Sequence, residues 1–123
     1  MIKYETKVLQ LGPLAQDFID SGILVLFDAD APSELAEFAV LHHHNILHQD
    51  IVIGDDLLID EKQFRIVAVG SVANKNLASL GHLVIKFNGN TQAEMPGDVS
   101  VENISLPPIK PGTIIKIVPG AKM

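Results

Sequence analysis

The chain of 123 residues contains no cysteine and no tryptophan. Without cysteine it can form no disulfide, no thiolate metal site and no cysteine nucleophile, and the absence fits a reducing compartment. Aromatic residues make up only 5 % of the chain, so its core must consist mainly of isoleucine, leucine and valine. The length suits one hydrophobic core, and we expect residues 1–123 to form a single domain.

Long apolar runs and basic clusters are also missing. The longest apolar runs have about five to six residues, far fewer than the ~20 that a membrane-spanning helix needs. The segment from Met1 to Lys7 is mixed and charged, unlike a signal peptide. The net charge is −6, and no group of lysines and arginines could bind a phosphate backbone. These absences predict a cytoplasmic protein that neither inserts into a membrane nor binds nucleic acid.

Short β-type segments with turn residues between them fill most of the chain. Two short helices are expected among them, from about Pro32 to Val40 and over residues 70–80, the second ending at Gly81. The gaps are too short for a doubly wound α/β sheet, so an antiparallel barrel or sandwich is favoured. The strand candidates are residues 2–11, 23–27, 51–53, 57–59, 64–69, 83–87, 99–104 and 113–118.

Histidine is the residue type that stands out. His42, His43 and His44 are consecutive, His48 follows closely, and His82 is the fifth. Imidazole is the side chain whose ordinary pKa lies nearest neutrality, so such a cluster suits proton transfer, metal binding or covalent phosphate transfer. Exposed loop histidines without chemical function are the simplest alternative.

Spacing alone does not choose among these alternatives. A zinc site could use His42, His44 and His82, although the chain lacks the H-E-x-x-H signature. A phosphohistidine would need an exposed ring nitrogen and hydrogen-bond donors for the phosphoryl oxygens. The turn at Gly70 and Ser71, before the second helix, could supply such donors. The chain lacks the Walker pattern of ATP sites, which a phosphocarrier does not need.

Several blocks of sequence, in order and at matched spacing, resemble one known family. This is the glucitol/sorbitol-specific enzyme IIA component of the bacterial phosphoenolpyruvate-dependent sugar phosphotransferase system (PTS). The resemblance covers nearly the whole chain. The blocks are Ala31-Pro32 with Leu35, Glu37 and Phe38; residues 67–73; Asn76-Leu77; Leu80-Gly81-His82; Phe87 and Gly89; Ala93-Glu94; Pro96-Gly97; and Pro111-Gly112.

The resemblance implies a fold, a reaction and partners. The fold would be all-β, a small closed antiparallel barrel of about seven strands with two short helices. The protein would be a phosphotransferase that needs no cofactor and no metal. It would accept a phosphoryl group from the histidine phosphocarrier HPr and pass it to the IIB component of the IIB/IIC permease, for uptake of a hexitol such as glucitol. The sequence is also compatible with a homo-oligomer.

The resemblance further implies that His42, the first of a His-x-His pair, is the phosphorylated residue. His44 matches the second of the pair, and His43 and Asn45 depart from the family pattern, in which glycine stands at the position of Asn45. We expect the preceding helix to end before His42, because the negative end of a helix disfavours a dianion. The His42 ring should face solvent, among amide hydrogens and an apolar collar.

The other site residues receive supporting roles. His44 would orient the reaction or hold a phosphoryl oxygen, His82 would approach as a further imidazole, and Gly70 and Ser71 would contact the phosphate. Two alternatives remain: a zinc-binding barrel that uses the histidine cluster, and a regulatory relative that has kept the fold and lost transfer.

Overall fold

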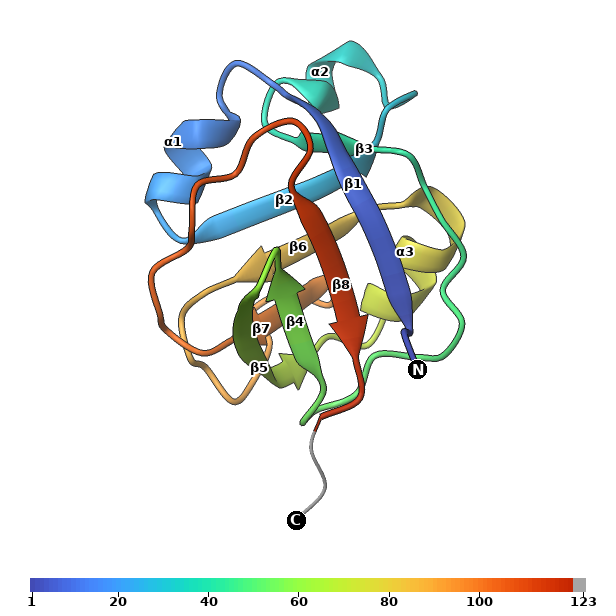
Figure 1. The fold of residues 1–123 in the computed structure, drawn as a ribbon, viewed down its shortest axis with the longest axis vertical. Coiled ribbons are helices and arrows are strands. Elements are labelled where there is room, and N and C mark those ends of the chain that lie inside the picture. The colour runs from blue at the N-terminus through green and yellow to red at the C-terminus, as the bar shows by residue number, and fades with distance from the viewer. Residues whose placement is uncertain (121–123) are drawn as a thin grey trace.

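The computed structural model describes residues 1–120, which form a closed barrel of eight strands with three short helices outside it (Figure 1). The prediction of a small mainly β barrel is confirmed, with one strand and one helix more than expected. The strands are β1 (Tyr4–Leu11), β2 (Ile23–Asp28), β3 (Val40–His42), β4 (Asp56–Ile59), β5 (Lys62–Val69), β6 (Leu83–Lys86), β7 (Asp98–Val101) and β8 (Ile114–Val118). The helices are α1 (Ala15–Asp20), α2 (Ser33–Ala36) and α3 (Ala73–Leu80).

The strands follow the order β1-β3-β2-β6-β7-β5-β4-β8 around the barrel, and β8 pairs with β1 to close it. The pairs β2–β3 and β6–β7 are parallel, so the expectation of a purely antiparallel barrel is wrong. A parallel pair needs a crossover connection rather than a tight turn. The segment with α2 provides it between β2 and β3, and residues 87–97 provide it between β6 and β7.

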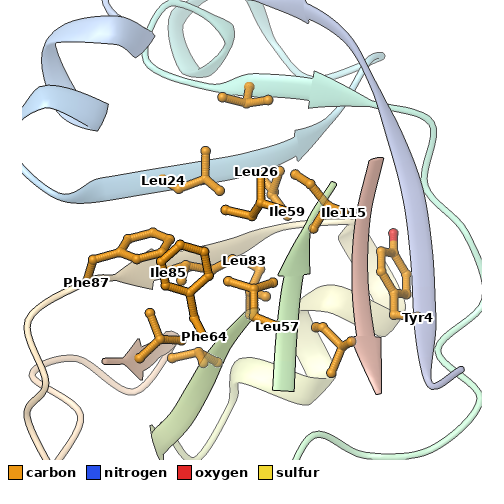
Figure 2. Close-up of a cluster of buried hydrophobic side chains, with 14 of the residues drawn as sticks. Tyr4, Leu24, Leu26, Leu57, Ile59, Phe64, Leu83, Ile85, Phe87 and Ile115 are labelled. Atoms are coloured by element: carbon orange, nitrogen blue, oxygen red, sulfur yellow. The ribbon is translucent and has the colours of Figure 1, made fainter. Parts of the chain in front are cut away.

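Alternating side chains build the core. On β5 the buried residues Phe64, Ile66 and Ala68 alternate with more exposed neighbours, as the two-residue period of a strand requires. Figure 2 shows leucines, isoleucines and phenylalanines from several strands meeting inside the barrel. Phe64 and Phe87 lie edge to face with ring centroids 5.0 Å apart. Burial of each such side chain is worth about 1.5–3 kcal/mol.

Some elements differ from the predictions. Strand β3 and helix α1 were not expected, residues 51–53 form no strand, and the first expected helix is reduced to the four residues of α2. The helix therefore ends well before His42, as predicted, and His42 lies on β3. Helix α3 and its end are confirmed, because Gly81 follows it in the left-handed conformation with φ of 64°.

The connection from β3 to β4 runs along β1 and past α3 (Figure 1). Strand β1 and the residue before it hold this connection at successive points. Glu5 accepts a hydrogen bond from the Asn45 side chain, and the Lys3 carbonyl accepts one from the His48 amide. The Lys3 ammonium donates to the Asp50 carbonyl at 2.9 Å. None of the helices within residues 1–120 has the length and apolar character needed to cross a membrane.

Candidate functional site

His42 lies inside one end of the barrel. On β3 it shares a face with Val40, and both side chains are fully buried. Its Nδ1 is 2.8 Å from the hydroxyl oxygen of Thr6, and its Nε2 is 2.8 Å from the carbonyl oxygen of Gly81. The ring of Tyr4 meets it edge to face, with centroids 6.2 Å apart. Strand β1, through Tyr4 and Thr6, and the turn at Gly81 thus enclose this imidazole.

These contacts define the protonation state of His42. A carbonyl oxygen only accepts hydrogen bonds, so Nε2 carries a hydrogen and donates it to Gly81. Burial lowers the pKa of His42 below its usual value of 6.5, which favours the neutral ring. Nδ1 then holds the lone pair and lies 2.8 Å from the Thr6 hydroxyl, whose single hydrogen also has the carbonyl oxygen of His43 within reach at 3.1 Å. Neither ring nitrogen is available to a reactant in this conformation.

The expectation that the His42 ring faces solvent is therefore wrong. Residues 40 and 42 share one face of β3, and Val40 belongs to the core, so His42 is turned inward with it. We expected amide hydrogens around the imidazole, but its two nitrogens face the hydroxyl of Thr6 and the carbonyl of Gly81. His43 and His44, by contrast, follow the end of β3 and are exposed.

His44 lies against Gly81. A Cβ atom added to Gly81 would be 3.0 Å from the Cβ and 3.2 Å from the Cγ of His44, so only glycine leaves room for this approach. The backbone amide of His44 donates to Oδ1 of Asp28 at 2.9 Å. This hydrogen bond, followed by one from the Asp30 amide, lowers the pKa of Asp28 below its usual range. Asp28 thus fixes the main chain of His44 while the His44 ring reaches solvent.

A depression lined by both polar and apolar residues adjoins His44. It has a volume of about 370 Å³ and is lined by His44, Asn45, Ile46, Leu47 and Ala78. The side chain of Ile46 is 66 % exposed, and that of Leu80, next to Gly81, is 51 % exposed. The expected apolar collar therefore lies beside His44, whereas His42 is enclosed below it. A larger hollow, between α1 and residues 103–109, contains none of the histidines.

His82 belongs to the same neighbourhood. It follows Gly81, and its Nδ1 donates to the carbonyl oxygen of Leu26 at 3.1 Å. Its half-buried ring packs on Phe27 with centroids 4.5 Å apart. Gly81 therefore contacts or adjoins three histidines. Its carbonyl oxygen accepts a hydrogen bond from His42, its Cα packs against the side chain of His44, and His82 follows it in the sequence. His48 is exposed on the long connection.

The turn at Gly70 and Ser71 lies at the other end of α3 from Gly81. A helix of eight residues spans about 12 Å. The amides of Gly70 and Val72 donate to the carbonyls of Asp98 and Pro96. A Cβ on Gly70 would be 2.2 Å from the Pro96 carbonyl oxygen, so close packing of the backbone accounts for this glycine. The expected phosphate contacts from Gly70 and Ser71 are therefore incompatible with a phosphoryl group near residues 42–44.

Sequence reasoning missed Thr6, Asp28 and the carbonyl of Gly81 as parts of this site. Asp28 pairs with His42 across the parallel strands β2 and β3, and Thr6 enters from β1. Only the order of the strands brings these residues together. Within residues 1–120, no three histidine, aspartate or glutamate side chains are grouped so that they could hold a metal ion. The zinc alternative with His42, His44 and His82 therefore has no site here.

The barrel closely resembles a solved structure. The chain matches "The Crystal Structure of PTS System IIA Component from Enterococcus faecalis V583" with a TM-score of 0.82 and 27 % identity. The match covers 94 % of this chain and 99 % of that one. The barrel is thus similar to that of a PTS IIA component.

Sequence comparison defines the family. The model of the family described as the PTS system glucitol/sorbitol-specific IIA component matches residues 3–116. The glucitol/sorbitol-specific EIIA components of Shigella flexneri and of Escherichia coli strain K12 are each 34 % identical to this chain over 113 residues. Each match covers 92 % of both chains. The chain belongs to this family, as its sequence motifs predicted, and has the general phosphotransferase role of a PTS IIA component.

Proposed function

We propose that this chain is a cytoplasmic phosphocarrier that holds a phosphoryl group on a histidine of residues 42–44. It accepts the group from HPr and passes it to the IIB component, which uses it in the uptake and phosphorylation of a hexitol. The observation that carries the proposal is an exposed imidazole, that of His44, beside a depression that Ile46 and Leu47 help to line. Transfer between two proteins requires the reacting atoms to be in line and water to be excluded, and an apolar rim favours both.

The step needs no cofactor. The lone pair of a neutral imidazole nitrogen attacks phosphorus, and a new N–P bond forms as the N–P bond of the donor histidine breaks. The electron pair of the broken bond returns to the donor nitrogen, so the phosphoryl group is all that moves. In the second transfer this chain is the donor: its own N–P bond breaks, and the phosphoryl group passes to IIB.

Family resemblance favours His42 as the acceptor, while its occupied ring nitrogens oppose it in this conformation. His42 could accept the group only after the reacting nitrogen had given up its contact with Thr6 or with Gly81 and become open to the partner protein. The general role can be tested without choosing a residue. Incubation with phosphoenolpyruvate, enzyme I and HPr should add the mass of one phosphoryl group, measured on the intact protein under alkaline conditions.

A regulatory relative without transfer is the second candidate, because a buried His42 with both nitrogens occupied suits a protein that has kept the fold and lost the reaction. That candidate would bind phospho-HPr and gain no mass. An unmodified mass, with enzyme I and HPr shown to be active on another IIA component, would overturn the phosphocarrier proposal.

A further inference from the structure

We propose that Thr6 is a positioning residue for phosphoryl transfer at His42, and that its hydroxyl is the hydrogen-bond partner of Nδ1 both before and after Nε2 receives the phosphoryl group. The proposal deepens the phosphocarrier function and rests on it, with His42 as the acceptor that family resemblance favours. It starts from the different chemistry of the two groups that hold the imidazole, the Thr6 hydroxyl and the Gly81 carbonyl. A hydroxyl can donate and accept a hydrogen bond, whereas a carbonyl oxygen can only accept one.

The hydroxyl of Thr6 has two acceptors within reach. Its oxygen is 2.8 Å from Nδ1 of His42 and 3.1 Å from the carbonyl oxygen of His43. Nε2 carries the hydrogen that is donated to Gly81, so Nδ1 holds the lone pair and the hydroxyl hydrogen can turn to it. Thr6 is 6 % exposed and His42 is fully buried, so the loss of this hydroxyl would leave Nδ1 as an unpaired buried polar atom.

The two contacts of the ring belong to different kinds of structure. Thr6 lies on β1, which pairs with β3 on one side and with β8 on the other. Gly81 lies in the turn after α3 and packs against His44, an exposed residue that borders the depression. Turns open more easily than strands that are paired on both sides. The contact between Nε2 and Gly81 is therefore the one that opens to a partner protein, while Thr6 keeps its hold on Nδ1.

Reaction at Nε2 requires its proton to leave, because only a ring nitrogen with a lone pair can attack phosphorus. When the contact with Gly81 opens, water takes the proton from Nε2 and returns one to Nδ1, so the ring stays neutral. Nε2 then forms the N–P bond as the N–P bond of the donor imidazole breaks, and the electron pair of the broken bond stays on the donor nitrogen. Nδ1–H now donates to the oxygen of Thr6, whose own hydrogen turns to the His43 carbonyl.

Removal of the hydroxyl affects the two states of the ring unequally. Valine has nearly the shape of threonine and lacks the hydroxyl. In a T6V chain the resting ring still donates its one N–H to Gly81. The phosphorylated ring carries its one N–H on Nδ1, where the same chain offers it no hydroxyl, and a buried donor without a partner is costly. The substitution therefore disfavours the reactive and phosphorylated forms of His42 relative to the resting form.

The first experiment compares four chains in the assay with phosphoenolpyruvate, enzyme I and HPr. T6V should take up phosphate about tenfold more slowly than the natural chain, as expected for one lost hydrogen bond. T6S keeps the hydroxyl and should transfer as fast as the natural chain. T113V is the matched control, because the Thr113 hydroxyl is also buried but accepts a hydrogen bond from the Lys110 amide. T113V should therefore transfer at the natural rate.

Two further measurements distinguish positioning from a merely structural role. With HPr and phospho-HPr mixed at a fixed ratio, the ratio of phosphorylated to free T6V at equilibrium should be about tenfold lower than for the natural chain. A loss of packing alone would weaken both states alike and leave this ratio unchanged. Ring-nitrogen NMR of the ¹⁵N-labelled natural chain should show a hydrogen on Nε2 of His42 before phosphorylation. After phosphorylation it should show phosphorus on Nε2 and a hydrogen on Nδ1.

The outcomes separate this proposal from the function on which it rests. If the natural chain takes up no phosphate while another IIA component does, the phosphocarrier function itself fails. If the natural chain is phosphorylated and folded T6V matches it in rate and equilibrium, or T6S is as slow as T6V, only the role of Thr6 is overturned. Should T6V not fold, the NMR spectrum of the natural chain decides. Phosphorus on Nδ1 of His42, or on a ring nitrogen of His43 or His44, overturns the proposal.

Discussion

Replacing Gly81 by alanine tests how the site is held together. The change adds one methyl group at a residue with φ of 64°, where an L side chain costs about 1–2 kcal/mol. The new Cβ would lie 3.0 Å from the Cβ of His44, so the His44 side chain must move by a few tenths of an ångström, whereas the distance of 3.4 Å to the Cβ of Asp28 is an ordinary van der Waals contact. Small displacements of reacting groups are costly, and we expect phosphate uptake from phospho-HPr to slow by about tenfold.

Gly112 provides the matched control. Its φ is 96°, and nothing lies within 4 Å of an added Cβ. G112A should lose stability by a similar 1–2 kcal/mol or so, measured by urea unfolding, and should transfer phosphate at the natural rate. G81N should be more stable than G81A, because asparagine tolerates the left-handed region, yet it should transfer phosphate as slowly as G81A. Natural transfer rates in a folded G81A protein would refute the role given to Gly81.

Three further predictions follow from named contacts. D28N should lower the free energy of unfolding by less than about 1 kcal/mol at neutral pH, because His44 then donates to a neutral oxygen at a largely solvated site. The difference in stability between D28N and the natural chain should become smaller as pH falls below 3.8. In that range the Asp28 carboxyl of the unfolded natural chain is protonated. The pKa of His42 is lowered from 6.5, so its contribution to stability is complete above pH 6.5 and is lost as pH falls, by at most about 1.4 kcal/mol per pH unit. K3M should cost about 3–5 kcal/mol, because it leaves the buried Asp55 carboxylate without the ammonium 2.7 Å away.

Each of these predictions has a control in the chain. D30N is the control for D28N. Asp30 is exposed, so D30N also removes one negative charge but leaves the hydrogen bond between His44 and Asp28 in place. H42Q should lack the part of the pH profile that His42 contributes below pH 6.5. Lys7 is exposed on the same strand as the core residue Tyr4, and K7M should change stability by less than about 0.5 kcal/mol. Equal losses in K3M and K7M would contradict the importance of the buried ion pair.

The sequence predicted the long, strongly patterned elements well. The strands around Phe64 and Ile115 and helix α3 with Gly81 at its end were all expected, because alternation and a terminal glycine are local signals. The parallel pairs were not expected, since they depend on how the connections cross. Strand β3 has only three residues, too few for a period to be recognised.

The orientation of the His42 ring was predicted wrongly because strand β3 was not recognised in the sequence. Once residues 40–42 are known to be a strand, the burial of Val40 places His42 inside the barrel as well. Spacing from Ala31-Pro32 located the histidines but carried no information on which way each ring faces. The partners Thr6, Asp28 and Gly81 come from distant parts of the chain, and no local pattern predicts them. Gly70 was assigned to phosphate because glycine turns before helices often bind anions, whereas here it makes room for Pro96.

The most direct test is an NMR spectrum of the ring nitrogens in the ¹⁵N-labelled natural chain, before and after phosphorylation by phospho-HPr at alkaline pH. We predict that a ring nitrogen of one histidine within residues 42–44 becomes coupled to ³¹P. A protein that takes up phosphate without coupling of phosphorus to a ring nitrogen of these three histidines would contradict the account.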